Sequence, residues 1–119
     1  MDILEFRDYC LSFKGTSEDT PFDEKTLVFK VMGKMFALVD IDNFSFTNLK
    51  AKPEKVIRLK QEYEGIIEGF HMNKKYWISV KLDGSISDAM IKKLIKNSYN
   101  EVVAKLTKKQ KEELKKIDN

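Results

Sequence analysis

The chain has 119 residues with 42% hydrophobic and 34% charged side chains, a balance typical of a globular domain rather than a disordered one. We expect one domain over residues 1–119 with a single hydrophobic core. The net charge is +3, and a single cysteine excludes a disulfide scaffold. The sequence has no membrane-spanning apolar run and no signal peptide, so we expect a cytoplasmic protein that does not bind membranes.

Residues 2–14 have the pattern of an amphipathic helix. Asp2 and Glu5 stand at capping-box positions, and Gly15 is a typical stop signal. One face carries apolar residues at helical spacing: Ile3, Phe6, Cys10 and Phe13. Cys10 lies on this face, so we interpret it as a small buried hydrophobic residue.

The polar segment 16–26 is expected to be a loop, which Pro21 and Phe22 hold against the core. This loop and the first helix share a set of acidic residues: Asp2, Glu5, Asp8, Glu18, Asp19, Asp23 and Glu24. A cation-binding patch is one interpretation. Their spacing matches no calcium loop, so a solvated surface is the favoured one.

Three strands then follow as an antiparallel meander, at residues 27–32, 35–41 and 44–49. Gly33-Lys34 and Asp42-Asn43 are the two turn signals between them. In the first strand, residues 27, 29 and 31 are expected to point to one face of the sheet and Lys30 to the other.

A second helix is predicted from Pro53 to just before Gly65, followed by a short strand at 66–70 and a turn at 72–75. The strand at 76–82 has two different faces. One is expected to meet the core: Tyr76, Ile78, Val80 and Leu82. The other carries Trp77, Ser79 and Lys81, so the indole is either covered by a neighbouring segment or free to stack on a partner.

Ser87 is a helix N-cap for the last long helix, with Ile86 and Ile91 at hydrophobic-staple positions. A second capping box, Thr107 with Gln110, predicts a short C-terminal helix, and we expect residues 107–119 to be peripheral or frayed. The order αβββαββα indicates an α+β fold, with an antiparallel sheet of about five strands and helices packed on one face.

Several stretches together resemble the MmcQ/YjbR family of small bacterial proteins. They are Phe29-Lys30-Val31, Gly33-Lys34-Met35-Phe36-Ala37, Leu49-Lys50 ahead of Pro53, the run from His71 to Trp77, Leu82-Asp83-Gly84, and Ser98-Tyr99. They cover nearly the whole chain in family order. The family pattern often has histidine where this chain has Tyr76, which argues against imidazole chemistry at that position.

The resemblance implies a CyaY-like (frataxin-like) α/β sandwich and DNA binding through a double-wing arrangement of hairpins. It implies no shared reaction and no catalytic residue. A frataxin-type iron-binding ridge would have to be formed here by Asp2, Glu5 and Asp8, and three acids on an exposed helix are unremarkable. We therefore expect no metal and no cofactor.

The first hypothesis is a nucleic-acid-binding module. Its candidate contact residues are Lys30, Lys34, Lys50, Lys52, Asn73, Lys74, Lys75, Trp77 and Lys81. Lysines neutralise phosphates, and an aromatic ring can stack on a base. The chain has two arginines, so we expect weak, salt-sensitive binding to DNA without sequence preference. The net charge of −5 in residues 1–24 and +5 in residues 91–119 favours a polyanion at the basic end, unless that end is simply solvated.

Two other functions stay open. The first alternative is a monomeric protein-interaction or regulatory domain, whose open sheet face docks a protein partner through Trp77 and the Gly33-Lys34 hairpin. An enzyme is the least supported interpretation. Its convergent set would be His71, Asn73, Asp83 and Tyr99, and nothing in their spacing brings these side chains together, so we expect no catalytic activity.

Overall fold

A computed structural model describes residues 1–117 of the chain. Its elements, in chain order, are α1 (Ile3–Leu11), β1 (Thr16–Asp19), β2 (Thr26–Val31), β3 (Lys34–Asp40), β4 (Phe46–Lys50), α2 (Pro53–Glu62), β5 (Ile66–Glu68), β6 (Trp77–Lys81), α3 (Asp88–Ala104) and α4 (Lys108–Lys116).

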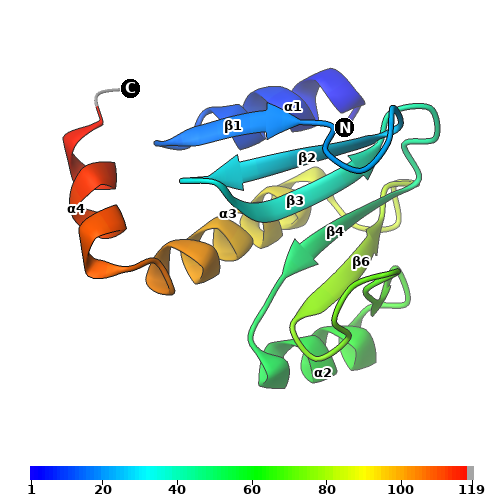
Figure 1. The fold of residues 1–119 in the computed structure, drawn as a ribbon. Helices are drawn as coiled ribbons and strands as arrows, with labels where there is room; N and C mark the ends of the chain where they lie inside the picture. Colours follow the sequence, from blue (N-terminus) through cyan, green and yellow to red (C-terminus); the bar gives the residue numbers. More distant parts are fainter. Residues whose placement is uncertain (118–119) are drawn as a thin grey trace.

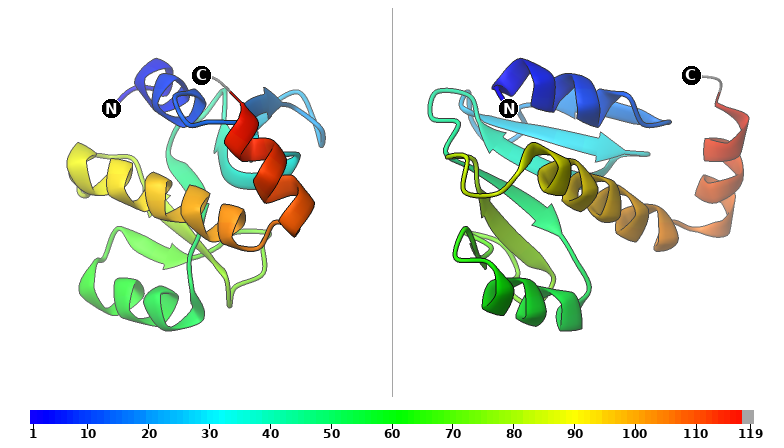
Figure 2. Two further views of the ribbon diagram at one scale, coloured as in Figure 1. Left: turned by 90° about the vertical axis from the view of Figure 1, so that its left-hand side faces the viewer. Right: turned by 180° about the vertical axis from the view of Figure 1, so that it is seen from behind.

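The strands form one six-stranded sheet in the order β1-β2-β3-β4-β6-β5, and all neighbours are antiparallel. Helices α1, α2 and α3 cover one face of this sheet, and α4 stands at one end of it (Figures 1 and 2). The main core fills the space between the sheet and these three helices. The other face carries no helix in the described residues, as the α+β prediction implied.

The prediction of a loop throughout 16–26 was wrong, because residues 16–19 form the edge strand β1. The sheet therefore has six strands rather than about five. Thr16, Ser17, Glu18 and Asp19 show no apolar alternation, since most of this strand is exposed. β1 is held in the sheet by backbone pairing with β2. Backbone pairing at a sheet edge does not require apolar side chains, so the sequence of β1 does not indicate a strand.

The first hairpin turns one residue earlier than predicted. Met32 and Gly33 both have positive φ values, 50° and 81°, so they are the two central residues of the turn, and Lys34 already belongs to β3. Further along, the partner of β2 jumps from Ala37 to Met35, which leaves Phe36 as an extra residue in β3.

The predicted division of the sheet into two faces is largely confirmed. Phe29 and Val31 lie in the main core, whereas Val28 points to the opposite face and joins a smaller cluster with Leu38 and Trp77. Tyr76 was wrongly placed in the main core, because it packs on this smaller cluster. Strand β6 begins only at the following residue, so the strand alternation does not extend back to Tyr76.

Ser98 of α3 is wedged between two strands of the sheet. Its Oγ donates to the carbonyl of Phe36 in β3 at 2.5 Å and accepts from the backbone N–H of Lys50 in β4 at 2.8 Å. The direct β3–β4 register ends at the neighbouring pair, Ala37 and Leu49. The two strands diverge from this point in Figure 1, so a buried hydroxyl bridges the place where the ladder opens.

The N-terminal corner joins three helices. The Tyr99 hydroxyl of α3 donates to the carbonyl of Lys14, in the turn that follows α1, at 2.6 Å. At Gly15, which has φ of 73°, a Cβ atom would lie 2.4 Å from a methyl carbon of Leu114, so glycine allows α4 to pack closely here. The predicted capping box of Thr107 and Gln110 is confirmed at the start of α4. Of the C-terminal segment that was expected to be peripheral, residues 118–119 lie outside the described residues.

The Ser98 bridge predicts a measurable loss of stability. Replacement of Ser98 by alanine leaves a buried carbonyl and a buried N–H without their partner, so we expect the free energy of unfolding to fall by about 1–3 kcal/mol. Urea denaturation followed by circular dichroism measures this change. The control is Ser17→Ala on the exposed edge strand, which should stay within about 0.5 kcal/mol of the parent. Equal effects of the two substitutions would contradict the bridging role.

The fold also predicts a chemically inert cysteine. Cys10 is completely buried on α1, and this burial raises the pKa of its thiol above the ordinary value. We therefore expect alkylation by iodoacetamide at mildly alkaline pH to be more than about tenfold slower in the native protein than in urea. Mass spectrometry of quenched samples gives both rates. Rapid labelling of the folded chain would be incompatible with this packing.

Candidate functional site

The opening between β3 and β4 contains a basic pocket of about 330 Å³, which we call the lysine pocket. Its lining comes from three strands and the end of α3: Lys34, Met35, Lys50, Trp77, Val102, Lys105 and Leu106. The strands diverge where Ser98 is inserted, and the last turn of α3 reaches the same pocket. Residues more than 50 positions apart in the sequence thus line one concavity.

Aromatic rings lie close to ammonium groups in and beside this pocket. The Nζ atoms of Lys105 and Lys75 lie 4.8 and 5.6 Å from the centre of the Tyr76 ring. The Nζ atom of Lys50 lies 5.9 Å from the Trp77 ring. These are cation–π distances, so the rings partially stabilise the positive charges of Lys50, Lys75 and Lys105.

The positive charge in the pocket is not neutralised. Partial burial, and then the nearby ammonium of Lys105, lower the pKa of Lys50, while Glu101 acts in the opposite direction. The carboxylate of Glu101, however, already lies 3.7 Å from Lys52 Nζ. Within residues 1–117, the ammonium groups of Lys34, Lys50, Lys75 and Lys105 make no ion pair. The pocket therefore has room and charge for an anion.

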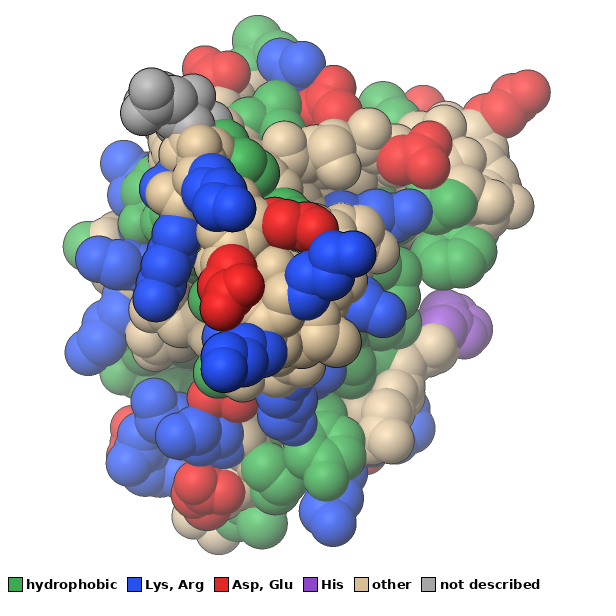
Figure 3. Space-filling view, turned by 60° about the vertical axis from the view of Figure 1, so that its left-hand side comes forward, with side chains coloured by type: hydrophobic (Ala, Val, Ile, Leu, Met, Phe, Trp, Pro, Cys, Tyr) green, Lys and Arg blue, Asp and Glu red, His purple; other side chains and the backbone are tan. Residues whose placement is uncertain are grey.

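The surface around this end of the molecule is also basic. Figure 3 views the molecule from the side on which α4 lies, and lysine and arginine side chains cover much more of that view than acidic ones do. Helix α4 itself carries five lysines and two glutamates. Such a surface attracts a polyanion over longer distances than the pocket alone would, although salt screens that attraction.

The structure brings together four of the nine residues proposed from the sequence, namely Lys34, Lys50, Lys75 and Trp77, with Lys52 beside them. The other four have different surroundings. Lys30 lies 3.7 Å from the carboxylate of Asp19, Lys74 donates to the Gly69 carbonyl, Asn73 accepts from the N–H of Lys75 within the turn, and Lys81 is at the opposite end of β6.

Trp77 does not present the open ring that base stacking requires. It is 7% exposed, because Met72 and Tyr76 pack over the small cluster to which it belongs. Tyr76 is partly buried and has the two lysines beside its ring, so it is the aromatic side chain nearest to the free positive charge.

Sequence reasoning missed Lys105. A lysine at the end of a helix is commonplace, because it interacts favourably with the helix dipole, so its position carried no separate signal. Its proximity to Lys50 depends on the angle at which α3 crosses the diverging strands. A contact of this kind, between residues 55 positions apart, cannot be read from local spacing.

The other residue sets considered in the sequence do not converge. Tyr99 donates to a backbone carbonyl in the helical corner, His71 lies on an exposed turn, and Asp83 accepts from Ser85 in a separate turn. In residues 1–117, no group of three His, Cys, Asp or Glu side chains is arranged to hold a metal ion. None of the helices among these residues has the length and apolar character needed to cross a membrane.

Comparisons with known proteins agree with one another. The YjbR family model matches residues 11–101. The uncharacterised protein YbdF of Escherichia coli O157:H7 is 43% identical over 90 residues, which are 75% of this chain and 74% of that protein. The uncharacterised protein YjbR of Escherichia coli K12 is 34% identical over 104 residues, covering 87% and 88% of the two chains.

Solved structures match as well. The crystal structure of Deinococcus radiodurans protein DR2400, from the domain family DUF419, has a TM-score of 0.88 and 37% sequence identity to this chain. The match covers 95% of this chain and 87% of that one. A Pseudomonas syringae protein has a TM-score of 0.69 at 30% identity, over 82% of this chain and 96% of its own. On the strength of the family model, these relatives and the shared fold, the chain belongs to the YjbR family.

Proposed function

We propose that this YjbR-family protein binds nucleic acid without sequence preference, through phosphate contacts in the lysine pocket. The observation that carries the proposal is the unneutralised charge of Lys34, Lys50 and Lys105 in the pocket. Lys75 adds a fourth charge nearby, because it shares the Tyr76 ring with Lys105. A phosphate in this position would supply the missing negative charge. It would also release counterions from the nucleic acid, which is the main source of non-specific affinity.

The residue types in the pocket explain why the binding would not select a base sequence. Lysine offers a compact charge, whereas guanine readout commonly uses the fork of an arginine. Both arginines lie outside the pocket in ion pairs, Arg7 with Glu18 and Arg58 with Glu62. A charge-dominated contact of about four lysines supports weak binding that salt reduces strongly. We also propose that the protein is cytoplasmic.

The alternative, a domain that docks a protein through Trp77, has less support. Such a contact needs a contiguous apolar surface. Trp77 is 7% exposed and covered by its neighbours, and three of the six residues that line the pocket with it are lysines. The observations at this end of the sheet therefore favour an anionic partner.

The proposal predicts a specific loss of DNA binding. In fluorescence anisotropy at low salt, the parent protein should bind labelled single-stranded and duplex DNA at micromolar concentrations. The double variant Lys50→Ala/Lys105→Ala should bind at least about tenfold more weakly, with a salt slope reduced by nearly 2 on duplex DNA, because about 0.9 is lost per phosphate contact.

A matched control separates the pocket from overall charge. Lys60→Ala/Lys96→Ala removes two lysines from the exposed surfaces of α2 and α3, outside the pocket. It should retain most of the affinity. Equal losses in the two double variants would assign binding to net charge, and unchanged anisotropy of DNA with the parent protein at low salt would refute nucleic-acid binding.

The charges around Lys50 predict opposite effects of two substitutions on its pKa. Lys105→Ala removes a like charge and should raise the pKa of Lys50, whereas Glu101→Gln removes an opposite charge and should lower it further. Titration of the lysine side-chain resonances by NMR measures both shifts. If Lys105→Ala left the pKa of Lys50 unchanged, the two ammonium groups would not share one site.

A further inference from the structure

A second concavity lies on the open face of the sheet, at the end away from the lysine pocket. It has a volume of about 460 Å³, and we call it the aromatic cleft. Leu38, Phe46 and Asn48 of the sheet line it, together with Phe22 from the loop before β2 and Phe70 from the loop before β6. The two loops come from opposite flanks of the sheet, and the volume falls in the range of pockets that hold small molecules.

The aromatic rings of the cleft remain accessible. Phe22 is 64% exposed and Phe70 is 44% exposed. The Phe70 ring stands nearly perpendicular to that of Phe46, with 5.3 Å between the ring centres. Exposed rings gathered in one concavity offer apolar area that a bound molecule would remove from water, and this would favour binding.

The wall that carries Phe70 is already fixed in place. Asn48 donates from Nδ2 to the Phe70 carbonyl at 3.2 Å, and the Phe70 N–H donates to Ser79 Oγ at 3.0 Å. Ser79, which is fully buried, donates in turn to Asn48 Oδ1 at 2.5 Å. Both backbone groups of Phe70 are thus held by side chains of the sheet, so little ordering is needed when a ligand enters.

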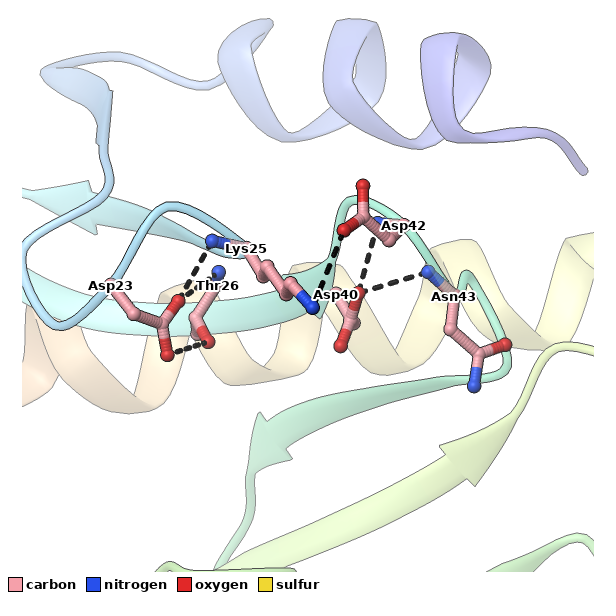
Figure 4. Close-up of polar contacts among 6 residues, drawn as sticks. All are labelled: Asp23, Lys25, Thr26, Asp40, Asp42 and Asn43. Atoms are coloured by element: carbon pink, nitrogen blue, oxygen red, sulfur yellow. Dashed lines mark hydrogen bonds and ion pairs between the residues drawn. The ribbon is translucent and has the colours of Figure 1, made fainter.

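Two carboxylates stand at the rim, Asp23 on the loop before β2 and Asp40 at the end of β3 (Figure 4). Asp23 Oδ1 accepts from the N–H groups of Lys25 and Thr26 at 2.8 and 2.7 Å. Asp40 Oδ1 accepts from two N–H groups of its own turn at 2.9 Å each. The backbone bonds lower the pKa of Asp23 and keep its carboxylate ionised at neutral pH.

The surroundings leave this negative charge largely uncompensated. Segments 19–26 and 40–43 together contain five acidic residues and one lysine, Lys25. The ammonium of Lys25 is directed to Asp42, 3.8 Å away, as Figure 4 shows. Within residues 1–117, no group is hydrogen-bonded to the second oxygen of Asp40. His71 is the remaining titratable group of the lining.

We propose that the aromatic cleft binds a small organic amine. Its apolar body lies between Phe22 and Phe70, and its ammonium group meets Asp40 and Asp23. The charge of the rim selects a cation, and the rings select a flat or branched apolar body. This site is separate from the lysine pocket and does not depend on nucleic-acid binding, since the rim repels the phosphates that the lysine pocket attracts.

Three probes that share one phenyl group test the proposal: phenethylamine, phenethyl alcohol and hydrocinnamate. Each is titrated into the full-length protein, and backbone amide shifts are followed by NMR. We expect the amine to bind most tightly and the carboxylate most weakly, with shifts concentrated in segments 20–26, 38–48 and 69–73. Failure of all three to bind, or shifts located elsewhere, would overturn the proposal.

Variants separate charge from apolar contact. Asp40→Asn keeps an acceptor for the turn and removes the charge, so it should weaken the amine about fivefold and leave the alcohol unchanged. Phe70→Ala should weaken all three probes. Glu113→Gln removes an exposed carboxylate on α4, outside the cleft lining, and should have no effect. The proposal is wrong if Asp40→Asn affects amine and alcohol equally, or if hydrocinnamate binds as tightly as the amine.

Discussion

The insertion of Ser98 between β3 and β4 is the contact on which both the fold and the candidate site depend. A direct ladder would pair these strands to their ends, but the hydroxyl bridges Phe36 and Lys50 instead. The strands diverge, and the end of α3 reaches the opening between them. At this opening Lys105 lies near Lys50, and the lysine pocket is found there. One buried side chain thus connects core packing to surface chemistry.

The two ends of the sheet differ in charge. The starts of β3 and β6 and the end of β4 carry the lysine pocket, while the opposite end carries the aromatic cleft with Asp23 and Asp40 at its rim. Ligands of opposite charge are therefore directed to opposite ends. This division explains how a chain with a net charge of only +3 can present a strongly basic surface at one end.

The segment from His71 to Trp77 has mainly a structural role. Met72 and Tyr76 cover Trp77, and the preceding residue, Phe70, is held by Asn48 and Ser79. The segment nevertheless touches both sites, because Tyr76 faces the lysines while His71 and Met72 line the cleft. The segment thus helps to shape both concavities.

Features that depend on neighbours in the chain could be predicted from the sequence. The caps at Ser87 and Thr107, the alternation in β2 and β6, and the buried thiol of Cys10 could all be predicted, because each follows from local hydrogen bonds or from the period of one element. Four features became apparent only in the folded structure: the pairing of β1, the burial of Trp77, the proximity of Lys105 to Lys50, and the cleft that Phe22 and Phe70 share. These features join residues far apart in sequence, and their geometry is set by how the helices and strands pack, which no local pattern records.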